Sequence, residues 1–166
     1  MKKTTLLLPL AFLLFGCDAQ TSATKTIDAS TVEQCSQGEY AYSLPVDLEK
    51  YTHAMALFSQ EGGDNPYSTT KFKQTCQSLP QVEDKLAYIA EQSAQATLPH
   101  PEAGKVLYFK QVDDTAYVVL AAQEDGWAGV SAAMAAAEPV ITRNIQLNSA
   151  IKHVTFGYAP GDEKQS

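Results

Sequence analysis

Histidines and carboxylates are the side chains of this sequence that could carry acid–base chemistry or bind a metal ion. His53 follows Glu49 by four residues, and that spacing places both side chains on one face of a helix. A zinc site needs three or four ligands, and neither a cysteine nor a second histidine is near these two in the sequence. We therefore expect Glu49 and His53 to form a solvated pair on a helix surface.

The other two histidines have different sequence contexts. His100 stands between two prolines and is followed by Glu102, so the pair could act as a general acid and base. The prolines favour an exposed, rigid loop, and we expect His100 to lie on the surface. His153 belongs to an alternating stretch with Ile151 and Thr155 on the same side, so we expect it to face solvent or a partner.

Two adjacent carboxylates, Asp113 and Asp114, separate two apolar stretches. The carboxylates of a glycosidase converge across the substrate at about 5–9.5 Å, whereas neighbouring residues of a turn point apart. We expect both aspartates to be turn formers.

The segment Glu124-Asp125-Gly126-Trp127 contains the only tryptophan, which follows two acids between a predicted strand and a predicted helix. An aromatic ring beside carboxylates can bind sugars, peptide amines or cations. We take Glu124, Asp125 and Trp127 as a candidate binding loop. The plainer alternative is that Asp125 or Gly126 caps the helix while Trp127 packs over the sheet edge.

Motifs of known catalytic and cofactor sites are missing from the sequence. It contains no Gly-x-Ser-x-Gly elbow, phosphate-binding glycine loop, His-Glu-x-x-His, Ser-x-x-Lys or calcium loop. The sequence therefore predicts no catalytic residue, no metal site and no cofactor.

The N-terminus has the features of an export signal. Two lysines precede an apolar run over residues 6–15, which is shorter than the roughly 20 residues needed to cross a bilayer. A short basic start followed by such a run is typical of a secretory signal peptide.

The run ends in Leu14-Phe15-Gly16-Cys17, which resembles the lipobox of bacterial lipoproteins. The resemblance implies cleavage after Gly16, acylation of Cys17 (palmitate included) and a domain anchored in the membrane that faces the periplasm. Asp18 resembles the signal that keeps enterobacterial lipoproteins in the inner membrane, with the outer membrane as the alternative. The competing interpretation is an ordinary cleaved signal with an incidental cysteine.

If Cys17 is lipidated, Cys35 and Cys76 remain as a pair in an oxidising compartment. Their separation is far from Cys-x-x-Cys, so we expect a structural disulfide rather than a redox site. Such a bridge would stabilise the fold by about 4 kcal/mol in the chain-entropy model. Buried thiols and a reactive cysteine are the alternatives.

The 166 residues, of which 45% are apolar, are enough for one ordinary domain. The formal net charge is −7, and without residues 1–16 the chain has 10 basic and 19 acidic side chains, a net charge of −9. This charge argues against a nucleic-acid partner and against a domain lying on anionic lipid. We expect four segments: a signal peptide over 1–16, the lipidated N-terminus and a flexible tether over 17–31, a single domain over 32–160, and a disordered tail over 161–166.

Hydrophobic periodicity predicts helices over residues 45–59, 68–78 and 80–97, where apolar side chains recur every three or four positions. A shorter helix is expected to begin at the Ser30-Thr31-Val32-Glu33 capping box and to include Cys35.

The periodicity then changes. Residues 105–112 and 115–122 are rich in β-branched and aromatic side chains and predict a hairpin. Helical spacing over 130–145 crosses Pro139, so we expect one kinked helix or two halves that meet there. A last strand is expected over 151–158. The predicted fold class is α+β, with N-terminal helices followed by a β-β-α-β unit and a small, mainly antiparallel sheet.

The C-terminal half, from the strand Thr115–Leu120 through the long helix to the strand Ile151–Phe156, resembles a GerMN-type module. The likeness covers about 50 residues and departs at Val119, where that family usually has Asp. GerMN modules occur in exported and lipidated bacterial proteins and have no established catalytic residues, so the resemblance implies no site.

We therefore expect a bacterial envelope lipoprotein that works as a binding or accessory module without catalysis, with another envelope protein as its partner. One alternative is an inhibitor or immunity-type lipoprotein that blocks a basic enzyme such as a lysozyme, steered by charge. A further alternative is an envelope hydrolase without a recognisable motif, for which His100, Glu102 and the loop 124–127 would be the candidates.

Overall fold

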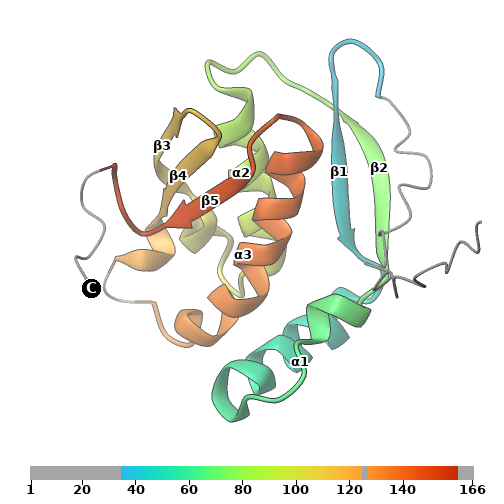
Figure 1. Cartoon of the computed structure of the whole chain (residues 1–166), viewed down its shortest axis with the longest axis vertical. Helices are drawn as coiled ribbons and strands as arrows, with labels where there is room; N and C mark the ends of the chain where they lie inside the picture. The colour runs from blue at the N-terminus through green and yellow to red at the C-terminus, as the bar shows by residue number, and fades with distance from the viewer. Residues whose placement is uncertain (1–34, 125–126, 161–166) are drawn as a thin grey trace, which may run out of the picture. The chain divides into compact units, whose positions relative to one another are not determined.

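The computed structural model describes residues 35–124 and 127–160 and shows an α+β fold (Figure 1). The α-helices of this part are α1 (Leu48–Glu61), α2 (Lys85–Thr97) and α3 (Val130–Leu147). Its strands are β1 (Glu39–Pro45), β2 (Phe72–Ser78), β3 (Val106–Val112), β4 (Thr115–Leu120) and β5 (His153–Phe156). Short 3-10 turns cover Pro66–Thr69 (η1), Pro101–Gly104 (η2) and Ala121–Gln123 (η3).

The strands form two small sheets. β1 and β2 make an antiparallel pair, while the second sheet has the order β3-β4-β5, with β4 antiparallel to β3 and parallel to β5. The parallel pair is possible because α3 connects β4 to β5 and returns the chain to the same end of the sheet.

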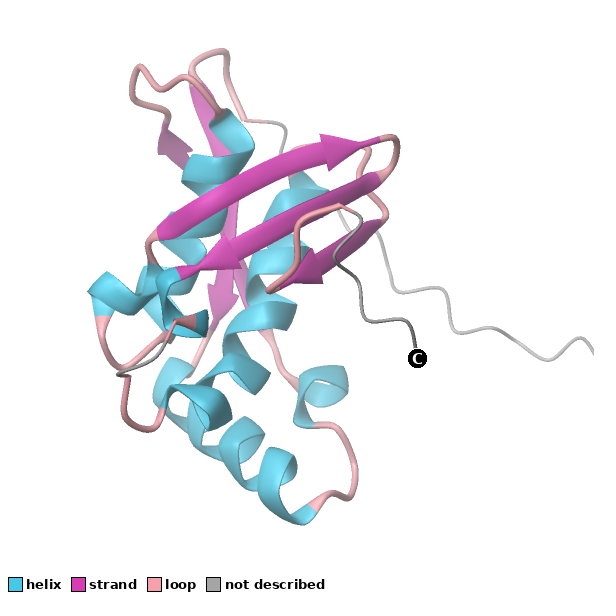
Figure 2. Ribbon diagram, turned by 90° about the vertical axis from the view of Figure 1, so that its left-hand side faces the viewer, coloured by secondary structure: helices cyan, strands magenta, loops and turns pink. Residues whose placement is uncertain are grey.

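Helix α3 lies at the centre of the molecule and contacts α1, α2, β1 and β5. Figure 2 shows the β3–β4–β5 sheet in front of the helices, which lie on only one of its faces. The inward side chains of β4, Val118 and Leu120 among them, pack with Ala137, Ile141 and Ile145 of α3 in the main core. This burial of apolar surface is the principal force that holds the sheet on the helix.

The outward face of the same sheet carries Tyr108 and Tyr117. Each is half-buried, with Tyr108 opposite Val119 and Tyr117 opposite Lys110 across the β3–β4 hairpin. The two tyrosines are therefore diagonal neighbours on that face and are not a directly opposed pair.

The edge of β1 is paired with a helix instead of a third strand. Asn144, which is fully buried, accepts from the Ser43 N–H through Oδ1 at 2.7 Å and donates through Nδ2 to the Ser43 carbonyl at 3.1 Å. One helical turn later, Asn148 makes the same two bonds with Ala41, at 3.0 and 2.7 Å. Asn144 and the C-cap residue Asn148, four positions apart, thus bind two residues of β1 that are two positions apart.

The only arginine of the chain, Arg143, covers the same strand pair. Its Nε donates to Ser43 Oγ at 2.9 Å, and its guanidinium lies 4.6 Å from the centre of the Phe72 ring on β2. This position combines a hydrogen bond with a cation–π contact, so Arg143 joins α3 to both strands.

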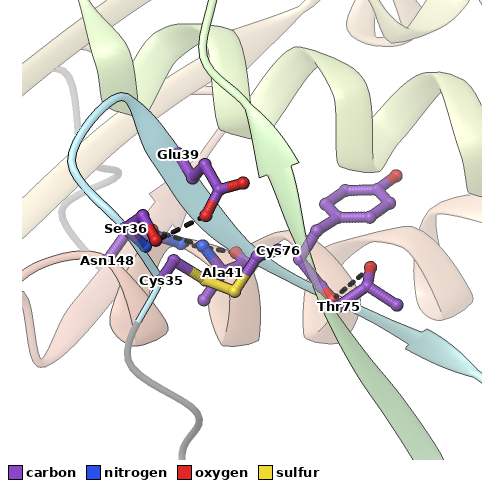
Figure 3. The surroundings of a disulfide bond; sticks show 8 residues. Cys35, Ser36, Glu39, Ala41, Thr75, Cys76 and Asn148 are labelled. Atoms are coloured by element: carbon purple, nitrogen blue, oxygen red, sulfur yellow. Dashed lines mark hydrogen bonds between the residues drawn. A yellow bond between two sulfur atoms is a disulfide. The ribbon is translucent and has the colours of Figure 1, made fainter.

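A disulfide joins Cys35, just before β1, to Cys76 in β2 (Figure 3). The Cα atoms are 5.5 Å apart, and Ala41, the residue opposite Cys76 in the register, is the one held by Asn148. The predicted Cys35–Cys76 pairing is therefore confirmed.

Several predicted elements are also confirmed. The helix expected over 45–59 is α1, which starts where the Asp47 side chain accepts from the Lys50 N–H. The hairpin is β3 and β4, the predicted helix over 130–145 is the single helix α3 with Pro139 inside it, and the last strand is β5, shorter than expected at both ends.

Two predictions of helices near the N-terminus are wrong. Residues 72–78 form strand β2, because their alternating exposure suits an edge strand paired with β1. Cys35 lies outside any helix and strand β1 follows it, while residues 30–34 of the expected capping box are outside the described residues. The helix expected over 80–97 begins only at Lys85, because the Asp84 side chain caps it by accepting from the Leu86 and Ala87 N–H groups.

Candidate functional site

A pocket of about 490 Å³ lies where η3, the start of α3 and the end of β5 meet. Its lining includes three aromatic side chains and one carboxylate, which come from segments about 30 residues apart in the chain. The lining residues used below are Gln123, Glu124, Trp127, Ser131, Phe156 and Tyr158. We refer to this hollow as the Trp127 pocket.

The parallel pairing of β4 and β5 creates the pocket. Phe156 lies opposite Val118, so the chain leaves β5 beside the end of β4, where η3 begins. Gly157 then donates its N–H to the Val118 carbonyl at 3.0 Å, which directs Tyr158 towards the segment after η3.

Glycine is required at position 157 for two reasons. Its φ of +81° lies in the left-handed region, and a Cβ at this position would come within 2.7 Å of Gln123 Nε2. The Gln123 side chain is fixed in turn, because its Oε1 accepts from the Leu120 N–H at 2.8 Å. Gln123 and Gly157, which line the pocket side by side, are therefore each held by a hydrogen bond to the backbone of β4.

Trp127 is half-buried and packs against the main core while also lining the pocket. The His100 ring lies 5.9 Å from it, centre to centre, with the planes tilted by 36°. The structure therefore brings together two predicted candidates, His100 and Trp127, that are 27 residues apart in the sequence.

The structure does not join the remaining predicted site residues to His100 and Trp127 in the same way. Glu102 is exposed on η2, and its side chain forms no hydrogen bond or ion pair with His100 within the described residues. Glu124 is exposed at the pocket, and Asp125 lies outside the described residues, as do Cys17 and Asp18.

A second hollow, a groove of about 720 Å³, lies between α1, the end of α2 and the start of α3. Glu49 and His53 both line it from α1, and small residues such as Ala96 and Ala132 line it from the other helices. Both side chains are exposed, and no salt bridge between them occurs in the described part of the chain. The groove brings no third ligand to this pair: among the described residues, three or more His, Cys, Asp or Glu side chains nowhere gather as a metal site would require.

The remaining predicted residues lie at the hairpin turn. Asp113 adopts a φ of +53°, and Asp114 forms an ion pair of 3.2 Å with Lys152. The hydrogen bond from Lys152 is the main cause that lowers the pKa of Asp114. His153 is exposed at the start of β5, where its N–H donates to the Asp114 carbonyl. These groups hold the start of β5 against the turn.

Sequence reasoning missed Phe156 and Tyr158 as parts of the site. Both were assigned to the last strand, and the pattern of the strand gives no sign of which segment its end approaches. Only the strand order, with β5 beside β4, reveals that they stand near the loop that contains Glu124 and Trp127.

No helix among residues 35–124 and 127–160 has the length and apolar character needed to cross a membrane. No protein-family model, curated protein or solved structure matches this chain.

Proposed function

We propose that this protein is a lipid-anchored binding module of the bacterial envelope, which holds a partner at the Trp127 pocket and performs no catalysis. The lipobox-like sequence ending in Cys17 supports the anchor, and the Cys35–Cys76 disulfide fits an exported chain. An acylated Cys17 would keep the domain at the membrane while residues 18–31 act as a tether.

The Trp127 pocket is the observation that carries the binding role. Among its described lining residues there is one carboxylate, Glu124, and there is no histidine, cysteine or lysine. A hydroxyl nucleophile needs a base within hydrogen-bond reach, and Ser131 has no such partner among these side chains. Three aromatic residues that share a hollow with polar groups able to orient a ligand are features of sites that hold one.

The anchor is tested by labelling cells with palmitate and comparing the wild type with Cys17→Ala. We expect label on the wild type alone. Absence of label from the wild type would overturn the anchored location and leave a cleaved, unattached domain.

The binding role is tested by capturing partners from detergent-solubilised membranes with the full mature chain and three variants. We expect one stoichiometric envelope partner that is lost with Trp127→Ala and weakened with Glu124→Gln. Glu61→Gln, an exposed carboxylate at the end of α1, serves as the matched control. Equal capture by all four proteins would show that the pocket does not bind the partner.

The inhibitor of a basic enzyme remains the second candidate, and the net charge of −9 for the mature chain favours it. Electrostatic steering falls steeply with ionic strength, since the Debye length shortens from about 10 Å at 0.1 M salt to about 3 Å at 1 M. A captured partner that is basic and released by salt would favour this candidate, whereas a salt-resistant complex would favour the accessory module.

A further inference from the structure

We propose that the Trp127 pocket binds an organic cation, an ammonium or guanidinium group, between its aromatic side chains and Glu124. The inference rests on the proposed binding function and specifies the chemistry of what the pocket holds.

The aromatic side chains are the first reason. Trp127, Phe156 and Tyr158 line one pocket of about 490 Å³ and approach it from two different segments. The face of each ring carries a negative quadrupole that attracts a cation within about 6 Å, and tryptophan attracts it most strongly. Rings that border one hollow, as these three do, can present aromatic surface to a cation that enters it.

The charge of the lining is the second reason. Glu124 is its only ionisable carboxylate among the described residues, and lysine, arginine and histidine do not line the pocket there. An anion would be repelled by this carboxylate and would find no cationic side chain in the described lining, although the start of α3 borders the pocket. A cation gains from Glu124 and from the net charge of −9 of the mature chain.

The hydrogen-bonding groups argue against a neutral sugar. Sugar recognition depends on several side chains that are available to bond hydroxyl groups, and amide side chains are among the best suited. The amide of Gln123 is held at its oxygen, because Oε1 accepts from the Leu120 N–H. The Gln123 Nε2 and the hydroxyl groups of Ser131 and Tyr158 are left as the neutral polar groups of the lining, a small set for a ligand with many hydroxyl groups.

An organic cation could reach the pocket from two sources, a lysine or arginine side chain on a basic partner protein or a free amine. Both present the same chemistry to the rings and to Glu124. The test therefore has one arm with tetramethylammonium and one arm with a short lysine- and arginine-rich peptide.

The single tryptophan of the chain makes the test direct, because all indole fluorescence comes from Trp127. The full mature protein is titrated in detergent with tetramethylammonium and, separately, with an uncharged compound in which carbon replaces the nitrogen. We expect saturable quenching or a shift of emission with the cation, and at least several-fold weaker binding of the neutral compound. Equal responses to the two compounds, or no response to the cation and the peptide, would overturn the proposal.

Glu124→Gln tests the carboxylate without disturbing the core, because Glu124 is exposed. We expect the affinity for the cation to fall about two- to fivefold, as for other solvent-exposed charge pairs. Glu61→Gln should bind as the wild type does. Unchanged affinity in Glu124→Gln would remove Glu124 from the site and overturn the assignment.

The ring is tested with Trp127→Phe and Trp127→Ala by calorimetry, since both lose the fluorescence signal. We expect Trp127→Phe to keep part of the affinity and Trp127→Ala to lose it. If the wild type and both Trp127 variants bind the peptide equally well, the binding is general charge attraction. That outcome would contradict the assignment of the Trp127 pocket as the cation site.

The outcomes separate this inference from the proposed function. Loss of partner capture in Trp127→Ala, without any response to either cation, would overturn the cation chemistry and leave the binding module standing. Cation binding without palmitate label on Cys17 would overturn the anchor and leave the pocket assignment standing. If the peptide binds and tetramethylammonium does not, the ligand is a basic side chain of a protein; the reverse result assigns a free amine.

Discussion

Asn144 and Asn148 pair with the free edge of β1 in the way that a neighbouring strand would, at Ser43 and Ala41. Each amide presents one acceptor and one donor to β1, which is the same pair of groups that a strand presents to its neighbour. An unpaired strand edge is prone to associate with other chains, and the asparagines remove that edge from β1.

The two asparagines differ in burial, which gives a prediction. Asn144→Ala should lower the free energy of unfolding by about 2–5 kcal/mol, because both backbone groups of Ser43 would lose a partner inside the protein. Asn148→Ala, at a half-buried position, should cost only about 1–2 kcal/mol. Urea denaturation of both variants measures the difference, and equal small losses would mean that water reaches the β1 edge.

Glu138 gives a prediction about pH. Burial raises the pKa of its carboxyl, so its charged form is disfavoured in the folded protein. A folded-state pKa above the unfolded one contributes stability at low pH that is lost as pH rises. Glu138→Gln should therefore raise the melting temperature at pH 7, and the gain should disappear as pH falls below about 4, the usual range for this group. A gain that is constant with pH would point to packing instead of charge.

Glu124 and Trp127 were predictable as site residues, whereas the contact of Trp127 with His100 was not. The loop with Glu124 and Trp127 was selected because an aromatic ring follows acids, and the structure does place both side chains at a pocket. The approach of His100 to Trp127 could not be foreseen, because it depends on how η2, which follows His100, packs against η3, which precedes Trp127.

At the scale of elements, helices were predictable where one face is continuously apolar. α1 and α3 show this, with Tyr51 and Met55 buried in α1 and Met134, Ile141 and Ile145 buried in α3. Residues 72–78 misled the prediction because Phe72 and Cys76 have helical spacing as well as the even spacing of a strand. A strand that is half-buried at the edge of a two-stranded sheet has too weak an alternation to decide between the two.

The contact between η2 and α2 depends on Gly104. A Cβ there would meet Gln95 N at 2.6 Å and Ala94 C at 2.9 Å, and both are backbone atoms that cannot move aside. Gly104→Ala should lower stability by about 1–3 kcal/mol, as expected for overpacking. As a control, Glu102→Ala changes an exposed residue of the same turn, and its stability should stay within about 0.5 kcal/mol of the wild type. Thermal unfolding of both variants measures the difference. A neutral Gly104→Ala would mean that η2 moves away from α2 easily.

The tyrosines between β1 and α2 predict sensitivity to alkali. Burial, followed by the neighbouring Tyr88, raises the pKa of Tyr40 to about 12, and burial raises the pKa of Tyr42 to about 12. Unfolded tyrosine ionises near 10, so the unfolded chain releases protons first and stability should fall as pH rises from 10 to 12.

Urea midpoints across this range, with phenolate absorbance measured in parallel, check the effect. Tyr42→Phe keeps the ring and removes the ionising group, so its stability should fall less steeply with pH. If the stability of the wild type stays constant up to pH 12, burial does not raise the pKa values of Tyr40 and Tyr42 as proposed.

At the scale of the whole molecule, the sequence predicted the fold class but not the complete arrangement. The composition and the segment order indicated α+β, and the Cys35–Cys76 pair was expected from cysteine number in an exported chain. The β1–β2 sheet could not be anticipated, because Asn144, Asn148 and Arg143, which bind its strand β1, belong to α3 and its C-cap, about 100 residues later in the chain. Contacts of that kind depend on three-dimensional packing and leave no local pattern.

The disulfide should matter for the stability of the whole domain. Cys35→Ala combined with Cys76→Ala should cost about 4 kcal/mol, because the unfolded chain regains the freedom of a closed loop of 41 residues. Reduction of the wild type should give a similar loss in urea denaturation. A loss below about 1 kcal/mol would show that the helix contacts alone hold β1 and β2 together.

The place of Cys35 also determines how the domain responds to mechanical tension. A pull on the chain before Cys35 would otherwise peel β1 away one hydrogen bond at a time, starting from its first residue. Because Cys35 is linked to Cys76, the tension enters β1 and β2 together and must act on both strands at once. Under such a pull, the β1–β2 pair would thus separate only if several of its hydrogen bonds broke together.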